Sequence, residues 1–109
     1  MDVVAAVNKI TKHTLTRNAG NLLYEHVRKF LDSHPDISKI IFDFQNIEDV
    51  STSFIQSTVV RLSNENIDVK LIHFNQTVQM KINTLIKISR IDPTLFKKAD
   101  RLPSSPTYI

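Results

Sequence analysis

Three stretches of the chain carry apolar residues at the spacing of an α-helix. In the first, Leu23, Val27 and Leu31 recur at intervals of four residues and therefore share one helical face. Asn18 and Gly20 precede this run, and both residue types favour the start of a helix through side-chain capping or backbone freedom. The three predicted helices span residues 18–33, 53–65 and 76–90.

Short runs rich in β-branched and aromatic residues alternate with these helices. Residues 37–44 and 67–74 are predicted strands, and the first has consecutive apolar residues typical of a strand covered on both faces. Residues 3–10 fit either an additional first strand or a short helix. This order predicts an α/β domain in which helices pack on a mixed sheet. Its expected core consists of Phe42, Ile40 or Ile41, Val59, Leu62, Leu71, Val27, Phe30 and Ile82.

The chain length of 109 residues fits one such domain, since single domains cluster near ~100–150 residues. Residues 1–102 are predicted to form it. Residues 103–109 contain two prolines and two serines and little that could be buried. We therefore expect these last residues to be a flexible tail or to lie across the surface.

The composition excludes several classes of protein. The chain has no cysteine, so it has neither disulfides nor thiolate ligands for a metal. Its single glycine, Gly20, cannot supply a glycine-rich phosphate-binding loop. The apolar runs are short, which predicts neither a membrane span nor a signal peptide. We therefore expect a cytoplasmic protein without a cofactor.

The charge of the chain is weakly basic. Its 14 Lys and Arg residues exceed its 11 Asp and Glu residues, for a formal net charge of +3. A nucleic-acid-binding protein is expected to gather its basic residues on one face or in one run. Here they are scattered, apart from Lys97, Lys98 and Arg101. The pattern favours a solvated surface, and nucleic-acid binding stays as an alternative function.

Titratable residues form no catalytic pattern in the sequence. His13, His26, His34 and His73 do not occur at metal-ligand spacing, and we interpret them as surface or partly buried residues. Asp43 stands in apolar surroundings at the carboxyl end of a predicted central strand, where ligand sites of open α/β sheets occur. No histidine or lysine close to it in sequence completes a catalytic set. The sequence therefore predicts neither an enzyme nor a metal site, and a small-ligand-binding domain is a further alternative.

A cluster of hydroxyl residues, Ser51, Thr52 and Ser53, precedes the second predicted helix. A serine or threonine oxygen there accepts a hydrogen bond from a free backbone N–H, so we expect at least one of them to cap the helix. Asn75 is the corresponding capping residue before the third helix. A phosphate also suits a helix N-terminus, because free N–H groups and the positive end of the helix dipole meet there. The sequence is therefore compatible with two roles for this cluster, helix capping and phosphorylation.

The segment IIFDFQNIEDVSTSF, residues 40–54, resembles the strand, loop and helix start of STAS domains. This fold occurs in anti-sigma-factor antagonists and in the cytoplasmic part of sulphate transporters. The closer resemblance is to a short STAS-like domain family of unknown function from bacteria and phages. Residues 16–19 resemble the start of that family's first helix, and Phe74 with Asn75 resembles its strand-end asparagine. The resemblance covers about residues 14–88.

This resemblance implies a regulatory protein-binding module, similar to the anti-sigma-factor antagonists, whose partner is a kinase-like ATPase. Aligned on the strand-end acid, the antagonists' Asp-Ser-Ser-Gly motif falls on residues 51–54, where Ser51 and Phe54 replace its aspartate and glycine. Ser53 then matches the phosphoacceptor. The implied partner-binding edge consists of Asp43, Asn46, Glu48, Asp49, Ser51, Thr52, Ser53 and Asn75.

Overall fold

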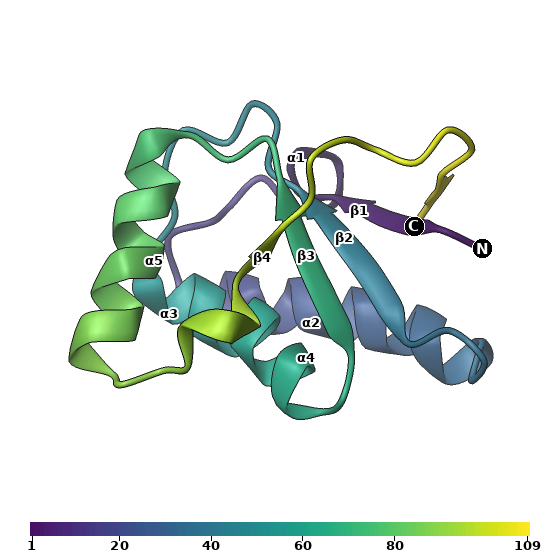
Figure 1. Cartoon of the computed structure of the whole chain (residues 1–109), viewed down its shortest axis with the longest axis horizontal. Helices are drawn as coiled ribbons and strands as arrows, with labels where there is room; N and C mark the ends of the chain where they lie inside the picture. Colours follow the sequence, from purple (N-terminus) through teal and green to yellow (C-terminus); the bar gives the residue numbers. More distant parts are fainter.

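The computed structural model describes all residues of the chain, 1–109. The strands are β1 (Val3–Ala6), β2 (Lys39–Asp43), β3 (Asp68–Ile72), β4 (Lys97–Lys98) and β5 (Thr107–Tyr108). They form one sheet in the order β4-β3-β2-β1-β5 (Figure 1). All four pairings are parallel, so the α/β class is confirmed, whereas the expected mixed sheet is wrong.

The predicted helices 18–33 and 76–90 are present, and the predicted helix 53–65 is divided into three helical elements. The helices are α1 (Val7–Ile10), α2 (Arg17–Ser33), α3 (Thr52–Ile55), α4 (Arg61–Asn64) and α5 (Gln76–Ile88), with a π-helical segment η1 (Gln56–Val60) and a 3₁₀ turn η2 (Pro93–Leu95). The segment η1 joins α3 to α4, so these elements replace the single predicted helix 53–65. Residues 3–10 contain both expected forms, because β1 runs directly into α1.

The start of α2 differs from the sequence prediction. Thr16 caps this helix, since its side-chain oxygen accepts a hydrogen bond from the Ala19 N–H at 3.0 Å. Asn18 and Gly20 lie inside the helix instead. Thr16 has the extended backbone that a capping residue requires, which explains why the helix begins directly after it.

The hydrophobic core lies between the sheet and helices α2, α3 and α4, which lie behind the sheet in Figure 1. At the centre of the sheet, Phe42 of β2 stands between Ala5 of β1 and Leu71 of β3. Helix α5 contributes three buried apolar side chains to the same core. Of the predicted core residues, the following are buried: Phe42, Ile40, Val59, Leu62, Leu71, Val27 and Ile82. Phe30 is only half-buried.

The face of the sheet that points away from this core is more polar than the sequence predicts. Ile41 lies in register with Lys70, which lies in register with Lys97, so these side chains form a row across β2, β3 and β4. Both lysines are exposed, whereas Ile41 is half-buried. The expectation of a strand fully covered on both faces is therefore wrong for β2. Lys97 Nζ donates a hydrogen bond to Asp68 Oδ1 at 2.8 Å, and this bond lowers the pKa of the Asp68 carboxyl.

The last residues of the chain are tied to the sheet. Val3 and Val4 of β1 pair with Thr107 and Tyr108 of β5, and the Ile109 N–H donates to the Val4 carbonyl oxygen at 3.1 Å. The connection from β4 to β5 passes the front of the sheet in Figure 1 to reach this edge. Residues 103–109 thus include an edge strand that the proline- and serine-rich sequence did not predict.

Helix α2 crosses the α3–η1 segment at very short range, and Gly20 makes this approach possible. The Thr58 hydroxyl donates to the Gly20 carbonyl oxygen at 2.7 Å, and the Ser57 hydroxyl donates to the Arg17 carbonyl oxygen at 3.2 Å. A Cβ atom at Gly20 would overlap the Ser57 hydroxyl and lie 2.7 Å from the Phe54 carbonyl oxygen. The single glycine of the chain therefore serves helix packing.

Candidate functional site

Asp43 and His73 form a pair at the carboxyl end of two neighbouring parallel strands, β2 and β3. Asp43 is the last residue of β2, and His73 directly follows β3. Asp43 Oδ1 lies 2.9 Å from His73 Nδ1 and also accepts a hydrogen bond from the Gln45 N–H at 3.0 Å. The Asp43 side chain is only 8% exposed, whereas that of His73 is 43% exposed. The buried carboxylate therefore fixes an imidazole ring that remains accessible.

This pair was missed in the sequence because its members are 30 positions apart. The predicted strand 67–74 included His73, but β3 ends at Ile72 and His73 lies outside it. Its φ of 60° lies in the left-handed region and turns the chain out of β3. Histidine is among the residues that adopt this conformation more often than most. The available signal was that both residues follow strands predicted to end at the same edge of the sheet.

The loop 45–50 beside this pair is held from two sides. Asn75 Nδ2 donates to the Glu48 carbonyl oxygen at 2.9 Å and to that of Ile47 at 3.2 Å. On the other side, the Thr14 hydroxyl donates to the Asp49 carbonyl oxygen at 2.7 Å. Asn75 also caps α5 as expected, because its Oδ1 accepts from the Val78 N–H at 2.9 Å. One side chain thus couples the loop to the start of α5.

The side chains of this loop include several of the predicted edge residues. Asn46 and Glu48 are exposed, and Asn46 has a φ of 64°. Asp49 is half-buried, and its Oδ1 accepts from the Val50 N–H at 2.8 Å and lies 3.8 Å from Lys81 Nζ. The structure therefore places Asp43, Asn46, Glu48, Asp49 and Asn75 around the same end of the sheet.

The hydroxyl cluster divides into one cap and two half-buried neighbours. Ser51 caps α3, because its Oγ accepts a hydrogen bond from the Phe54 N–H at 2.9 Å. Its own N–H donates to the Thr14 carbonyl oxygen at 2.9 Å, which links the cap to the segment before α2. Thr52 and Ser53 lie in the first turn of α3, and both are half-buried. The capping role is thus confirmed for Ser51.

Replacing Ser51 by alanine should lower the free energy of unfolding by about 1 kcal/mol, because the Phe54 N–H loses its acceptor. Ser53 makes no capping bond, so Ser53→Ala should change the stability by less than about 0.5 kcal/mol. Urea denaturation of the two variants measures this difference. Equal losses in both would contradict the assignment of the cap to Ser51.

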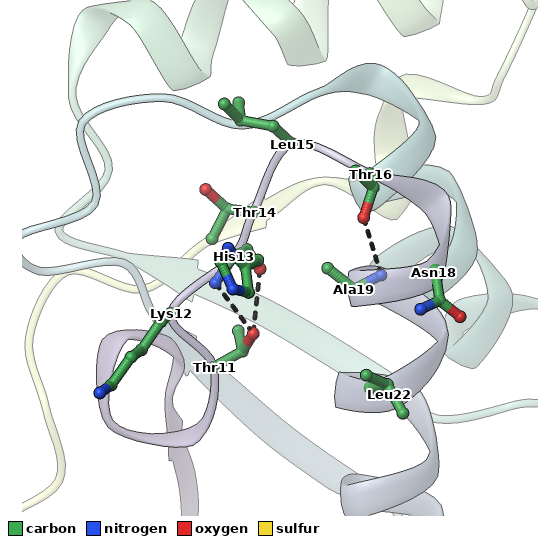
Figure 2. A pocket seen from close by; sticks show the side chains of 9 residues that line it. All are labelled: Thr11, Lys12, His13, Thr14, Leu15, Thr16, Asn18, Ala19 and Leu22. Atoms are coloured by element: carbon green, nitrogen blue, oxygen red, sulfur yellow. Dashed lines mark hydrogen bonds between the residues drawn. The ribbon is translucent and has the colours of Figure 1, made fainter.

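A pocket of about 380 Å³ lies between the segment 11–16 and the first turns of α2. Figure 2 shows Leu22 and Ala19 on the helix side of this pocket and the threonine-rich segment on the other side. Leu15 and Leu22, which line this pocket, are 60% and 57% exposed. Thr14 lines the pocket and also contacts the loop 45–50, so the two features adjoin. No sequence motif indicated the pocket.

The arrangement sets limits on the chemistry of this site. The side-chain partner of His73 is Asp43, and no hydroxyl is bonded to its ring, so the two residues do not form a nucleophile-activating triad. No three His, Asp or Glu side chains gather as potential metal ligands. What the site offers is an oriented imidazole, a fixed polar loop and an adjoining pocket with apolar margins.

Searches with protein-family models, among curated proteins and among solved structures gave no match for this chain. The fold and the geometry of the site are therefore the basis for its function. Among its helices, none combines the length and the apolar character needed to traverse a lipid bilayer.

Proposed function

We propose that this chain is a regulatory protein-binding module. Its binding surface, which we call the edge surface, consists of the loop 45–50, the start of α3 and the pocket between Leu15 and Leu22. We also propose that the chain does not catalyse the turnover of a small substrate. It extends the resemblance to anti-sigma-factor antagonists, for which the expected partner is a kinase-like ATPase.

The observation that carries this proposal is the pair of exposed leucines beside a preformed pocket. Exposed apolar groups that are flanked by polar groups are typical of protein interfaces, in which an apolar centre is surrounded by a polar rim. Here Leu15 and Leu22 supply the apolar part, and Asn46 and Glu48 supply exposed polar groups nearby. Two hydrogen bonds of Thr14, one to Asp49 and one to Ser51, connect the segment that lines the pocket with the loop 45–50 and the start of α3.

The fixed geometry of the loop 45–50 supports the same function. Its carbonyl groups accept hydrogen bonds from Asn75 and Thr14, which tie the loop to the start of α5 and to the segment before α2. A surface that is ordered in advance loses less conformational entropy on binding. The edge surface is therefore suited to recognition by rigid docking.

A phosphate on Ser53 is the proposed means of regulation, as implied by its alignment with the antagonist phosphoacceptor. Ser53 lies in the first turn of α3, where the helix dipole tolerates the added charge of about −1.5 to −2. The same charge would disfavour an apolar or acidic surface of the partner. Ser53→Asp should therefore weaken partner binding, whereas Ser53→Ala should retain it.

Binding is tested by affinity capture from the native host with the wild-type chain and two matched variants. Leu22→Asp places a charge at the edge of the pocket, and we expect it to lose the captured partner. Ile88→Asp places the same charge on another exposed apolar residue, at the far end of α5, and we expect it to behave as wild type. Direct binding of the purified partner then gives the Kd of each form.

Two results would contradict the proposal. The first is that both variants lose the partner, or that both variants retain it. The second is a partner without an ATP-binding domain, which would leave a binding module but remove the kinase-like ATPase. Binding that falls steeply with salt and requires nucleic acid would instead favour the nucleic-acid alternative, because each phosphate contact releases counterions.

A further inference from the structure

We propose that His73 is a phosphoryl acceptor through its Nε2 atom and that Asp43 is the residue that positions it. An ionised carboxylate only accepts hydrogen bonds, so the 2.9 Å contact with Asp43 Oδ1 places the hydrogen of the ring on Nδ1. In the neutral ring the lone pair is then on Nε2. Because the side chain of His73 is 43% exposed, this nucleophilic ring can meet a donor from solvent.

The orientation of the ring is fixed by several independent contacts. Asp43 Oδ1 is itself held by the Gln45 N–H at 3.0 Å, and the Asp43 side chain is almost completely buried. His73 keeps a left-handed backbone with φ of 60°, a conformation that costs energy and persists where the surroundings determine it. Such strained residues cluster at functional sites. The other exposed histidines, His13 and His26, have no bond to a carboxylate.

The transfer step needs only an activated phosphoryl donor with a good leaving group. The Nε2 lone pair attacks phosphorus, an N–P bond forms, and the bond from phosphorus to the leaving group breaks, with its electron pair departing on that group. The ring gains a positive charge while Nδ1 keeps its hydrogen, so no proton has to move. Asp43 lies beside this developing charge and stabilises it through the existing hydrogen bond.

The surroundings of His73 also suit the product. Helix α5 begins at Gln76, three residues further on, and has no acidic residue in its first turn. Asn75 Oδ1 already caps the Val78 N–H, but the N-terminal end of the helix still carries partial positive charge that favours a phosphate. His73 is the exposed member of the pair, so a phosphoryl group can reach it from solvent.

Reaction of the purified chain with phosphoramidate tests this inference without any protein partner. This small donor transfers its phosphoryl group to nucleophilic imidazoles and releases ammonia. Mass spectrometry with fragmentation that preserves phosphohistidine gives the rate of modification at each of the four histidines. We expect His73 to react about tenfold faster than His26, the effect of one charge-assisted hydrogen bond to a developing charge.

The variant Asp43→Asn should reduce the rate at His73 to that of His26 while the rate at His26 stays unchanged. The product should lose its phosphate in acid, which separates it from a phosphoserine at position 53. A wild-type rate at His73 no higher than at His26 would overturn the inference, whether or not Asp43→Asn folds. An unchanged rate at His73 in a folded Asp43→Asn variant would also overturn it. Neither result bears on the proposed partner binding, which is measured separately.

Discussion

Replacing Phe42 by alanine should lower the free energy of unfolding by about 3–5 kcal/mol. Phe42 is completely buried at the centre of the sheet, between Ala5 and Leu71 of the neighbouring strands. Its removal would leave a cavity that the surrounding strands and helices fill only in part. Because small domains have total stabilities of about 5–15 kcal/mol, this one change should remove a large part of the total. Urea denaturation followed by circular dichroism measures the loss.

Ile41→Ala is the matched control in the same strand. Ile41 faces the more polar side of the sheet and is only half-buried, so its loss should cost about 1 kcal/mol. A loss of less than 1 kcal/mol for Phe42→Ala, or similar losses for the two variants, would show that the core does not lie on the Phe42 face.

The second large effect is expected at Gly20. In an exposed helix, glycine to alanine stabilises by about 1 kcal/mol, but at Gly20 the added methyl group would overlap the Ser57 hydroxyl. Overpacking of this kind costs about 1–3 kcal/mol, and here it would also disturb the bond from Thr58 to the Gly20 carbonyl. We therefore expect Gly20→Ala to destabilise the protein, as measured by the shift of the urea midpoint.

Ser57→Ala supplies the control for this contact. Alone, it removes the hydroxyl that bonds to Arg17 and Phe54 and should destabilise moderately. Combined with Gly20→Ala, it should recover part of the loss, because the overlap with the hydroxyl disappears. The contact with the Phe54 carbonyl oxygen would remain, so the recovery should be incomplete. A stabilising Gly20→Ala would disprove the close approach of α2 to the α3–η1 segment.

The parts of the fold that the sequence predicts are those governed by local periodicity. The spacing of Leu23, Val27 and Leu31 specifies α2, and the β-prone run around Phe42 specifies β2. The short strands β4 and β5 have no such pattern, because each is two residues long and is formed only by pairing with an existing edge. The π-helical segment η1 could not be predicted from the sequence either. It accompanies the packing of Ser57 and Thr58 against α2, which is a tertiary contact.

The candidate site was predictable only in outline. Asp43 could be placed at the carboxyl end of a central strand, and Ser51 and Asn75 could be expected as helix caps. The partner of Asp43 could not be identified, because His73 reaches it only through the alignment of β2 with β3 and a left-handed turn. The pocket near Leu22 depends on the path of the segment 11–16, which no periodicity determines.

Hydrogen exchange of the chain alone and in complex with its captured partner tests the edge surface most directly. We expect slower exchange on binding in residues 11–22 and 44–53, which contain the segment before α2, the loop 45–50 and the start of α3. The row of Lys70 and Lys97 on the opposite face of the sheet should be unaffected. Protection confined to β4 and β5, with residues 11–22 and 44–53 unchanged, would contradict the proposed binding surface.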